Sequence, residues 1–360
     1  MVGKMKKIFP CVEINLKKII HNTRVINEIC KSKNIHVVGV SKVYCAKLPI
    51  VEAMLNGGIE IIGDSRMENL KKLEQLKCRK MLLRIPMESH ASEVVKYADI
   101  SLNSEINTIK ALSRAAKRVN KIHNVILMID LGDLREGVLE SETLENVKEI
   151  IKLPNIRLCG IGTNLTCYGG VIPDSENLGR LVKIREAIEI NNNLSLPIVS
   201  GGNSSSLYLV LNGTIPNGIN QLRIGEAIVL GRETAYGNKI PDCYSDSFIL
   251  KGEIVEIKDK PSVPKGKIGM DAFGKVPNFI DKGIIKRAIV AIGRQDIDPD
   301  GLKPVDNCIE ILGGSSDHLI LDVSRCNILY KVGDVIDFTM DYGCLLRTMT
   351  SPYVKKYYLS

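Results

Sequence analysis

The sequence predicts an α/β protein: a (β/α)8 barrel of the TIM type followed by a mostly antiparallel β domain. Short apolar runs alternate with helical patterns over residues 37–224, and eight such runs occur, which is the strand count of a closed barrel. After Gly237 the pattern changes to short alternating runs broken by Gly, Pro, Asp and Asn, as in antiparallel domains. A chain of 360 residues is long enough for both parts.

The boundary between the two predicted domains lies near residues 232–245. We expect residues 1–235 to form the barrel and residues 236–360 the β domain. The first residues of the chain, about 1–10, are expected to pack on the β domain.

The first elements are a short strand and a helix within residues 11–30, because apolar side chains recur there at a spacing of three to four. A helix through residues 51–55 is closed by Gly57 and Gly58. The predicted barrel strands are residues 37–42, 59–62, 81–85, 100–102, 125–129, 157–161, 197–199 and 221–224, with helices such as 105–118, 143–152 and 176–190 between them. The predicted β-domain strands are 247–257, 288–292, 318–323 and 335–340.

An open doubly wound sheet is the alternative architecture for the first part of the chain. It is less favoured because no GxGxxG follows the first strand and the strand count stops at eight.

The composition is that of an ordinary soluble protein, with 44% hydrophobic and 25% charged residues and no Trp. The net charge of +8 is spread over small clusters without interleaved aromatics, which argues against nucleic acid as a partner. Ten cysteines lack CxxC pairs or regular spacing, so we expect reduced thiols and neither a disulfide framework nor a metal site. No secretory signal or membrane-length apolar run is found, and a cytoplasmic location without membrane contact is expected.

Lys42 is the residue around which the predicted site is built. It ends the apolar run VVGVSK, which reads as a buried parallel strand. Burial of an amine lowers its pKa, and a neutral amine can form a Schiff base with an aldehyde. A lysine that simply reaches solvent from the strand end is the other interpretation of this run.

The active sites of barrel enzymes lie at the C-terminal ends of the strands. Here these ends are polar and rich in hydrogen-bond donors: Lys42, Asp64, Ser65, Arg84, Asn103, Ser104, Asp130, Arg135, Thr163, Asn164, residues 200–204 and residues 223–226. The loops after strands seven and eight, GGNSSS and RIGEA, can present backbone N–H groups to a phosphate. GGNSSS alone also fits an ordinary turn and helix cap. Together with a strand-end lysine, however, these loops describe a site for pyridoxal 5'-phosphate (PLP).

These segments resemble fold-type III PLP enzymes of the alanine racemase family, which join a PLP barrel to a β domain. VEINLKKIIHN resembles the family's opening helix, VSKVYC its lysine strand, DLGDLREG its DTGMxRxG segment, and GNSSS and LRIGE its cofactor loops. SSDHLILDV resembles the SMDxxxxD segment of the β domain, and TSPYVKKYYL the family's terminus. The resemblance covers nearly the whole chain.

The resemblance implies a role for each matching residue. Lys42 carries PLP, Arg135 contacts its phenolic oxygen, and Arg223 contacts its pyridine nitrogen. The phosphate contacts are Ser204, the backbone at Gly225 and Glu226, and Tyr44, although the family's tyrosine normally stands four residues after the lysine rather than two. Asn164 and Asn203 complete the predicted cofactor set.

Two departures from the family's pattern favour its ornithine racemase branch. The segment that usually reads THxA is TNLT, so an amide at Asn164 replaces an imidazole. Phe273 stands where a β-domain tyrosine normally acts as the second acid/base. Arg223 also separates the chain from related decarboxylases, which place a carboxylate beside the pyridine nitrogen.

We therefore expect a racemase that interconverts L- and D-ornithine by a two-base mechanism, with Lys42 as one base. The barrel offers no second base among the residues considered at its strand ends. The other base is expected from the β domain of the partner in a homodimer with shared active sites, with Asp271 preferred, on a strand face shared with Phe273, and His318 second.

Substrate contacts are expected from Ser316, and Glu226, Asp296 and Asp317 are candidates for the partner of the side-chain ammonium. A racemase of alanine, lysine or another amino acid is the alternative substrate assignment. A non-catalytic PLP carrier is another possibility, although such carriers end after the barrel. A metal-assisted aldolase or dehydratase would need a PNHxC-like companion to Asp317 and His318, and the sequence has none.

Overall fold

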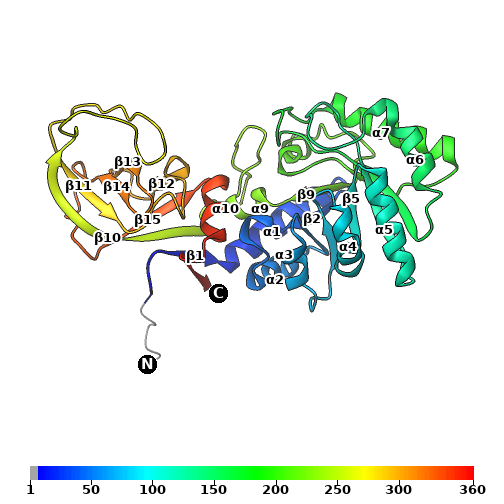
Figure 1. Ribbon diagram of the computed structural model, residues 1–360, viewed down its shortest axis with the longest axis horizontal. Coiled ribbons are helices and arrows are strands. Elements are labelled where there is room, and N and C mark those ends of the chain that lie inside the picture. The colour runs from blue at the N-terminus through cyan, green and yellow to red at the C-terminus, as the bar shows by residue number, and fades with distance from the viewer. Residues whose placement is uncertain (1–6) are drawn as a thin grey trace. The chain divides into compact units, whose positions relative to one another are not determined.

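The computed structural model describes residues 7–360 (Figure 1). Its contacts divide the chain into two compact units. One is Lys17–Ser245, and the other joins Asp246–Ser360 to the described residues up to Leu16. The division expected from the sequence, at residues 235 and 236, lies ten residues before the observed break.

The first unit contains a closed barrel of eight parallel strands, in the order β2-β3-β4-β5-β6-β7-β8-β9. The strands are β2 (His36–Val40), β3 (Ile61–Asp64), β4 (Arg79–Leu82), β5 (Ile100–Asn103), β6 (His123–Met128), β7 (Ile156–Gly162), β8 (Ile198–Ser200) and β9 (Gln221–Ile224). The first and last strands pair directly, Val38 with Arg223 and Gly39 with Ile224. The predicted barrel is confirmed, and each predicted run overlaps one strand.

Helices connect the strands and cover the barrel (Figure 1). They are α1 (Leu16–Lys31), α2 (Leu48–Asn56), α3 (Met67–Lys72), α4 (Ala91–Tyr97), α5 (Ile106–Arg118), α6 (Thr143–Ile150), α7 (Ser175–Asn192), α8 (Leu207–Leu211) and α9 (Glu226–Leu230). α7 begins with a capping box in which the Asp174 side chain accepts hydrogen bonds from the N–H groups of Glu176 and Asn177.

Alternating strand residues build two separate apolar clusters. Met81, Ile126 and Met128 belong to a cluster made of strand residues from inside the barrel. Their neighbours Leu82 and Leu127 belong to a second cluster, together with residues of the surrounding helices. This is the two-residue period of a strand buried on both faces, and it explains why the strands read as continuous apolar runs.

The second unit is built on an eight-stranded sheet. Its strands are β1 (Cys11–Asn15), β10 (Phe248–Pro261), β11 (Ile284–Val290), β12 (Leu302–Pro304), β13 (Glu310–Gly314), β14 (Leu319–Asp322), β15 (Val335–Met340) and β16 (Lys355–Leu359), and helix α10 (Tyr342–Thr350) precedes the last strand. These strands pair in antiparallel fashion, except that β1 and β16 are parallel. The mostly antiparallel β domain is confirmed, and β1 belongs to its sheet.

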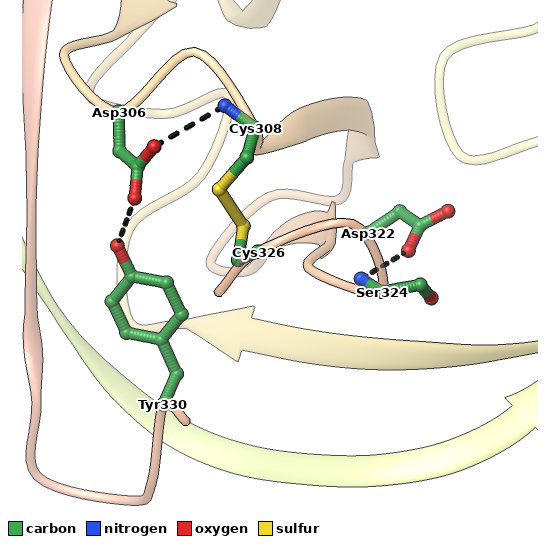
Figure 2. The surroundings of a disulfide bond; sticks show 6 residues. All are labelled: Asp306, Cys308, Asp322, Ser324, Cys326 and Tyr330. Carbon is green, nitrogen blue, oxygen red and sulfur yellow. Dashed lines mark hydrogen bonds between the residues drawn. A yellow bond between two sulfur atoms is a disulfide. The ribbon is translucent and has the colours of Figure 1, made fainter. Parts of the chain in front are cut away.

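A disulfide between Cys308 and Cys326 joins the segments on either side of the β13–β14 hairpin (Figure 2). The Asp306 carboxylate beside it accepts hydrogen bonds from the Tyr330 hydroxyl at 2.8 Å and from the Cys308 N–H at 3.2 Å. The expectation that all ten cysteines are reduced thiols is therefore wrong for this pair. Cysteine spacing could not show it, because the hairpin brings the two segments together.

We expect the double variant Cys308→Ser/Cys326→Ser to unfold more easily in urea than the natural chain. The bridge closes a loop with a sequence separation of 18, and constraining such a loop in the unfolded chain is worth about 3 kcal/mol. Urea denaturation without reductant measures the difference. A reductant should weaken the natural chain but leave the double variant unchanged, and a natural chain indifferent to the reductant would contradict the disulfide.

In the described part of the chain, no helix is both long and apolar enough to cross a membrane.

Candidate active site

Lys42 lies at the mouth of the barrel, two residues after β2 ends, and opens the short helix η1 (Lys42–Tyr44). Its side chain is exposed, so the expected burial by the protein itself is wrong. The preceding residue is firmly held, because the Ser41 hydroxyl donates to the Asp64 carboxylate at 2.6 Å. That carboxylate is fully buried and also accepts from the Arg66 N–H and the Asn69 amide. Burial raises its pKa, and these hydrogen bonds and the charge of Lys42 oppose the shift.

Tyr44 does not face the mouth as its predicted phosphate contact requires. The side chain is fully buried, and its hydroxyl donates to the sulfur of Met54 in α2 at 3.0 Å. Burial raises its pKa well above the ordinary tyrosine value. This placement argues against the predicted role, because the hydroxyl is already bound inside the barrel wall.

The loops after β8 and β9 meet at Ser204. Its hydroxyl oxygen lies 3.4 Å from the Gly225 N–H nitrogen and 3.3 Å from that of Ala227, and both N–H groups donate to it. Gly202 before it has φ +110°, a conformation that favours glycine. A Cβ at Gly225 would lie 3.0 Å from the Cβ of Val40, so glycine lets this corner approach the end of the Lys42 strand.

Arg223 is a buried cation at the end of β9, with 4% exposure. Its guanidinium donates to the Ser200 hydroxyl at 2.5 Å, the Thr163 carbonyl at 2.7 Å and the Asn164 side-chain oxygen at 3.4 Å. Burial lowers its pKa to about 10, which still leaves it charged near neutral pH. The predicted strand-end position is therefore observed, and the cation is held entirely by neutral oxygens in these bonds.

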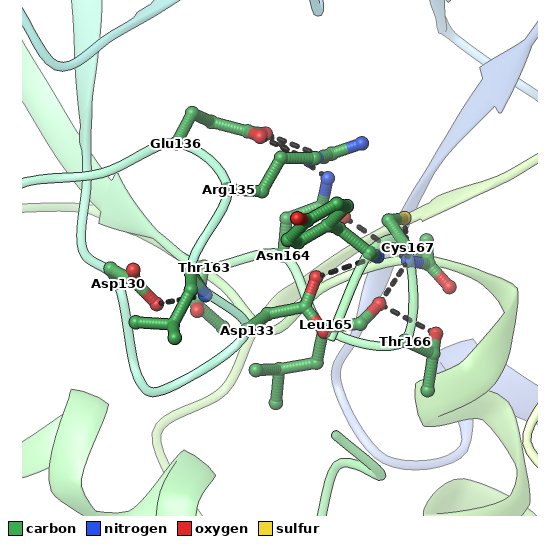
Figure 3. Close-up of polar contacts among 12 residues, drawn as sticks. Asp130, Asp133, Arg135, Glu136, Thr163, Asn164, Leu165, Thr166 and Cys167 are labelled. Carbon is green, nitrogen blue, oxygen red and sulfur yellow. Dashed lines mark hydrogen bonds and ion pairs between the residues drawn. The ribbon is translucent and has the colours of Figure 1, made fainter. Parts of the chain in front are cut away.

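The loops after β6 and β7 join beside this cation (Figure 3). Arg135 forms an ion pair with Glu136, and the Glu136 carboxylate accepts a hydrogen bond from the Asn164 amide at 3.1 Å. The Asn203 amide donates to the Asn164 oxygen at 3.1 Å and to the sulfur of Cys167 at 3.4 Å. Arg135, Asn164, Asn203 and Arg223, all predicted cofactor residues, are thus linked by a short chain of contacts.

Two aspartates hold these loops through hydrogen bonds from backbone N–H groups. The Asp130 carboxylate accepts hydrogen bonds from the N–H groups of Gly132 and Leu134. The buried carboxylate of Asp133 accepts from the N–H groups of Tyr168 and Val171 in the next loop. The segment around Cys167 is therefore held by the hydrogen bonds that it donates to Asp133, in the loop that carries Arg135.

Glu226, a predicted phosphate neighbour and candidate ammonium partner, opens α9 and is half-buried. Its carboxylate lies 3.4 Å from the Arg232 guanidinium. A substrate ammonium would have to share this carboxylate with Arg232.

Asp271 does not lie on a strand, because residues 262–283 between β10 and β11 form turns and irregular backbone. The expected strand face shared with Phe273 is therefore wrong. The exposed Asp271 carboxylate accepts hydrogen bonds from the N–H groups of Lys275 and Phe273, which lower its pKa. The Gly and Pro residues of this segment keep it out of the sheet, and a carboxylate held in this way is a weak base.

The other predicted β-domain residues fall into two groups. Ser316, Asp317 and His318 are exposed in the turn between β13 and β14. Asp296 is buried instead, and its carboxylate accepts a hydrogen bond from the Ser351 hydroxyl at 2.5 Å. Asp296 therefore holds the segment after α10 in place, which argues against its predicted contact with a substrate ammonium.

Comparison with known proteins identifies the family. A model of the alanine racemase N-terminal domain matches residues 14–233. The chain is 55% identical over 350 residues to the ornithine racemase of Acetoanaerobium sticklandii, covering 97% of this chain and 99% of that protein. The chain belongs to the alanine racemase family.

This alanine racemase-family chain is also 44% identical over 353 residues to the lysine racemase of Thermotoga maritima, covering 98% of this chain and 99% of that one. A solved alanine racemase of Bartonella henselae with covalently bound pyridoxal phosphate shares the fold, with a TM-score of 0.74, 16% identity, and coverage of 98% of this chain and 100% of that one. The predicted family, fold class and enzyme class, an amino-acid racemase, are confirmed.

Sequence reasoning missed two residues at the mouth of this family member: Asp133, which holds the loop after β7, and Cys167. It placed Asp64 at a strand end but did not predict that this carboxylate holds Ser41. Both aspartates act through contacts that only the closed barrel creates. Cys167 had a signal in the sequence, since TNLTCYGG follows a predicted strand end directly.

Proposed function

We propose that this protein is a PLP-dependent racemase that interconverts L- and D-ornithine. The observation that carries the cofactor assignment is the buried, cationic Arg223 on the strand beside that of Lys42. The three oxygens that accept its hydrogen bonds, from Ser200, Thr163 and Asn164, are all neutral. Such a cation suits a ring nitrogen that must accept a hydrogen bond, and Arg cannot give up its proton near neutral pH.

Two buried hydroxyls support a ligand at this place. In the described residues, the hydroxyl oxygens of Thr163 and Ser205 are buried without a hydrogen-bond partner. Buried polar groups are normally paired, so each exception calls for an explanation such as a missing ligand or water. We call the loop after β8, residues 201–206, the phosphate loop. Ser205 follows Ser204 in this loop, and Thr163 begins the loop after β7. The residues present therefore fit PLP.

We assign the cofactor roles residue by residue. Lys42 holds the cofactor covalently, Ser204 with the N–H groups at Gly225 and Glu226 holds the phosphate, and Arg223 faces the ring nitrogen. Arg135, oriented by Glu136, supplies a cation for the phenolic oxygen. Asn164 and Asn203 support these two guanidiniums and the phosphate loop through the contacts described above.

When bound, PLP acidifies the Cα–H of an attached amino acid. Lys42 then removes or returns the Cα proton on one face, while an acid/base on the other face does the reverse. Arg223 keeps the ring nitrogen unprotonated, which limits side reactions at the cofactor. Ornithine is favoured over lysine and alanine because 55% identity to an ornithine racemase exceeds 44% identity to a lysine racemase.

Four further predictions stay proposals. They are the homodimer with shared sites, the cytoplasmic location, the substrate contacts of Ser316 and Asp317, and the candidate second bases Asp271 and His318. The fixed hydrogen bonds to the Asp271 carboxylate stabilise its charged form, which weakens Asp271 as a base.

The substrate assignment predicts that purified protein with PLP racemises ornithine faster than lysine, and lysine faster than alanine. Chiral chromatography of each L- and D-amino acid after incubation measures all six rates. Faster lysine turnover would move the assignment to lysine and leave the reaction class intact. No racemisation of any amino acid, with PLP demonstrably bound, would identify a non-catalytic carrier instead.

A further inference from the structure

A racemase that uses Lys42 on one face needs a second proton carrier on the other. The β-domain candidates have weaknesses: the charged form of Asp271 is stabilised by two backbone N–H groups, and His318 stands in an exposed turn. The barrel mouth, by contrast, contains a thiol. Cys167 follows β7 by five residues, and it is exposed.

Cys167 differs from every other free cysteine of the chain. Of the eight free thiols, five are buried, Cys45 and Cys78 are intermediate, and Cys167 is the exposed one. A thiol used in proton transfer must be reachable, whereas structural cysteines are generally buried. Exposure at this place therefore separates Cys167 from the cysteines that pack the core.

The thiol is tied to the proposed cofactor residues. Asn203 donates to its sulfur at 3.4 Å, and Asn203 directly precedes the phosphate-loop residue Ser204. The same amide donates to the Asn164 oxygen and to the Leu165 carbonyl. The hydrogen bond from Asn203 thus links the sulfur, in the loop after β7, to the loop that carries Ser204.

Two guanidiniums share an electrostatic environment with this sulfur. Burial lowers the pKa of Arg135, but the hydrogen bond to Glu136 and the interaction with Cys167 outweigh it and raise that pKa. Burial also lowers the pKa of Arg223, and the interactions with Glu136 and Cys167 oppose that shift. The sulfur therefore lies within electrostatic reach of both guanidiniums.

The barrel topology gives the order in which Lys42, Cys167 and the proposed cofactor residues follow one another around the mouth. Going round the closed barrel from β2, the strands are β9, then β8, then β7. Lys42 follows β2 and Cys167 follows β7, whereas Arg223 and Ser204 belong to the two positions between them. Around the mouth of the barrel, Arg223 and Ser204 therefore come between the lysine and the thiol.

Independent observations point to a ligand at this place. The Thr163 hydroxyl, in the same loop as Cys167, and the Ser205 hydroxyl, beside Ser204, are fully buried and unpartnered. Buried hydroxyls without partners call for a group that the protein alone does not provide. Two such hydroxyls therefore belong to the loops that carry Cys167 and Ser204.

We infer that Cys167 is the acid/base on the face opposite Lys42, in place of Asp271 or His318. The inference rests on the proposed racemase function. In one direction Lys42 takes the proton from Cα and the Cys167 thiol gives its proton to the other face, which leaves a protonated amine and a thiolate. In the other direction the thiolate takes the proton and the protonated amine returns its own, so no further reactant is needed.

The test compares Cys167→Ala and Cys167→Ser with the natural enzyme and with Cys78→Ala. Serine keeps an acceptor for Asn203 but ionises far less readily than a thiol, so it separates proton transfer from positioning. We expect both Cys167 variants to lose racemisation at least about 100-fold, with PLP still bound, and Cys78→Ala to keep it. In deuterated water, each Cys167 variant should still exchange the Cα–H of one ornithine enantiomer but not of the other.

A second readout does not depend on turnover. Iodoacetamide should label Cys167 in the cofactor-free protein, as peptide mapping will show, and PLP with ornithine should slow that labelling at least tenfold. Unchanged labelling on loading would overturn the inference, because the thiol would then lie away from the ligand.

Three further results would contradict the proposed role of Cys167. A Cys167→Ser enzyme that racemises normally, or a variant that loses exchange of both enantiomers, would overturn the role of Cys167. So would one-sided exchange in Asp271→Asn or His318→Gln. If the natural protein binds PLP but racemises no amino acid, the proposed function itself is wrong, which is a separate result.

Discussion

Replacing Lys42 with alanine should reduce ornithine racemisation by about four orders of magnitude. The variant loses the amine that we propose as both the covalent attachment point of the cofactor and the base on one face of Cα. Folding should be little affected, because the Lys42 side chain is exposed and the adjacent Ser41 keeps its hydrogen bond to Asp64. Chiral chromatography measures the rate, and the absorbance of the cofactor shows whether PLP is still bound.

Lys47 provides the matched control for this experiment. Like Lys42, it is exposed and lies in the segment between β2 and α2. We therefore expect Lys47→Ala to keep the activity. Borohydride reduction of the PLP-loaded natural protein followed by peptide mapping should place the pyridoxyl group on Lys42. A label on Lys47, or an active Lys42→Ala enzyme, would show that the residue was assigned wrongly.

Arg223→Glu should slow racemisation by about 100-fold or more and increase transamination, which is measured as keto-acid formation. A carboxylate beside the ring nitrogen favours its protonation, and a protonated ring withdraws electrons more strongly. The variant should also be less stable, since Glu cannot donate hydrogen bonds to the Thr163 carbonyl as the guanidinium does.

The loss of stability needs its own control. Arg223→Lys keeps the positive charge but cannot reach Ser200, Thr163 and Asn164 together, as the guanidinium does. It should lose stability without gaining keto-acid formation. If Arg223→Glu folds, binds PLP and racemises at the natural rate, Arg223 does not contact the ring nitrogen.

The barrel was predictable because each strand is buried on both faces. Met81 faces the inside and Leu82 the helices, so the whole run is apolar and stands out in the sequence. The polar residues that follow each run then mark the mouth of the barrel. Lys42, Ser204 and Arg223 were found this way, since their places depend only on strand ends and short loops.

Other residues depend on contacts that no local pattern records. Tyr44 stands two residues after Lys42, yet one turn of η1 directs its hydroxyl to Met54. Asp271 looked like part of a strand, but its carboxylate closes a turn on Lys275. Cys308 precedes the β13–β14 hairpin and Cys326 follows it. The pairing of the two strands brings these cysteines together.

The direct pairing of β2 with β9 makes the proposed cofactor site depend on closure of the barrel. Lys42 follows the first barrel strand and Arg223 ends the last, so nearly the whole barrel lies between them in the chain. While β9 is still inside the ribosome, the nascent chain already contains Lys42 but cannot yet bring Arg223 beside it. Contacts between such distant segments form slowly in folding. Uptake of PLP during refolding would therefore report closure of the barrel, and a chain cut before β9 would not retain the cofactor.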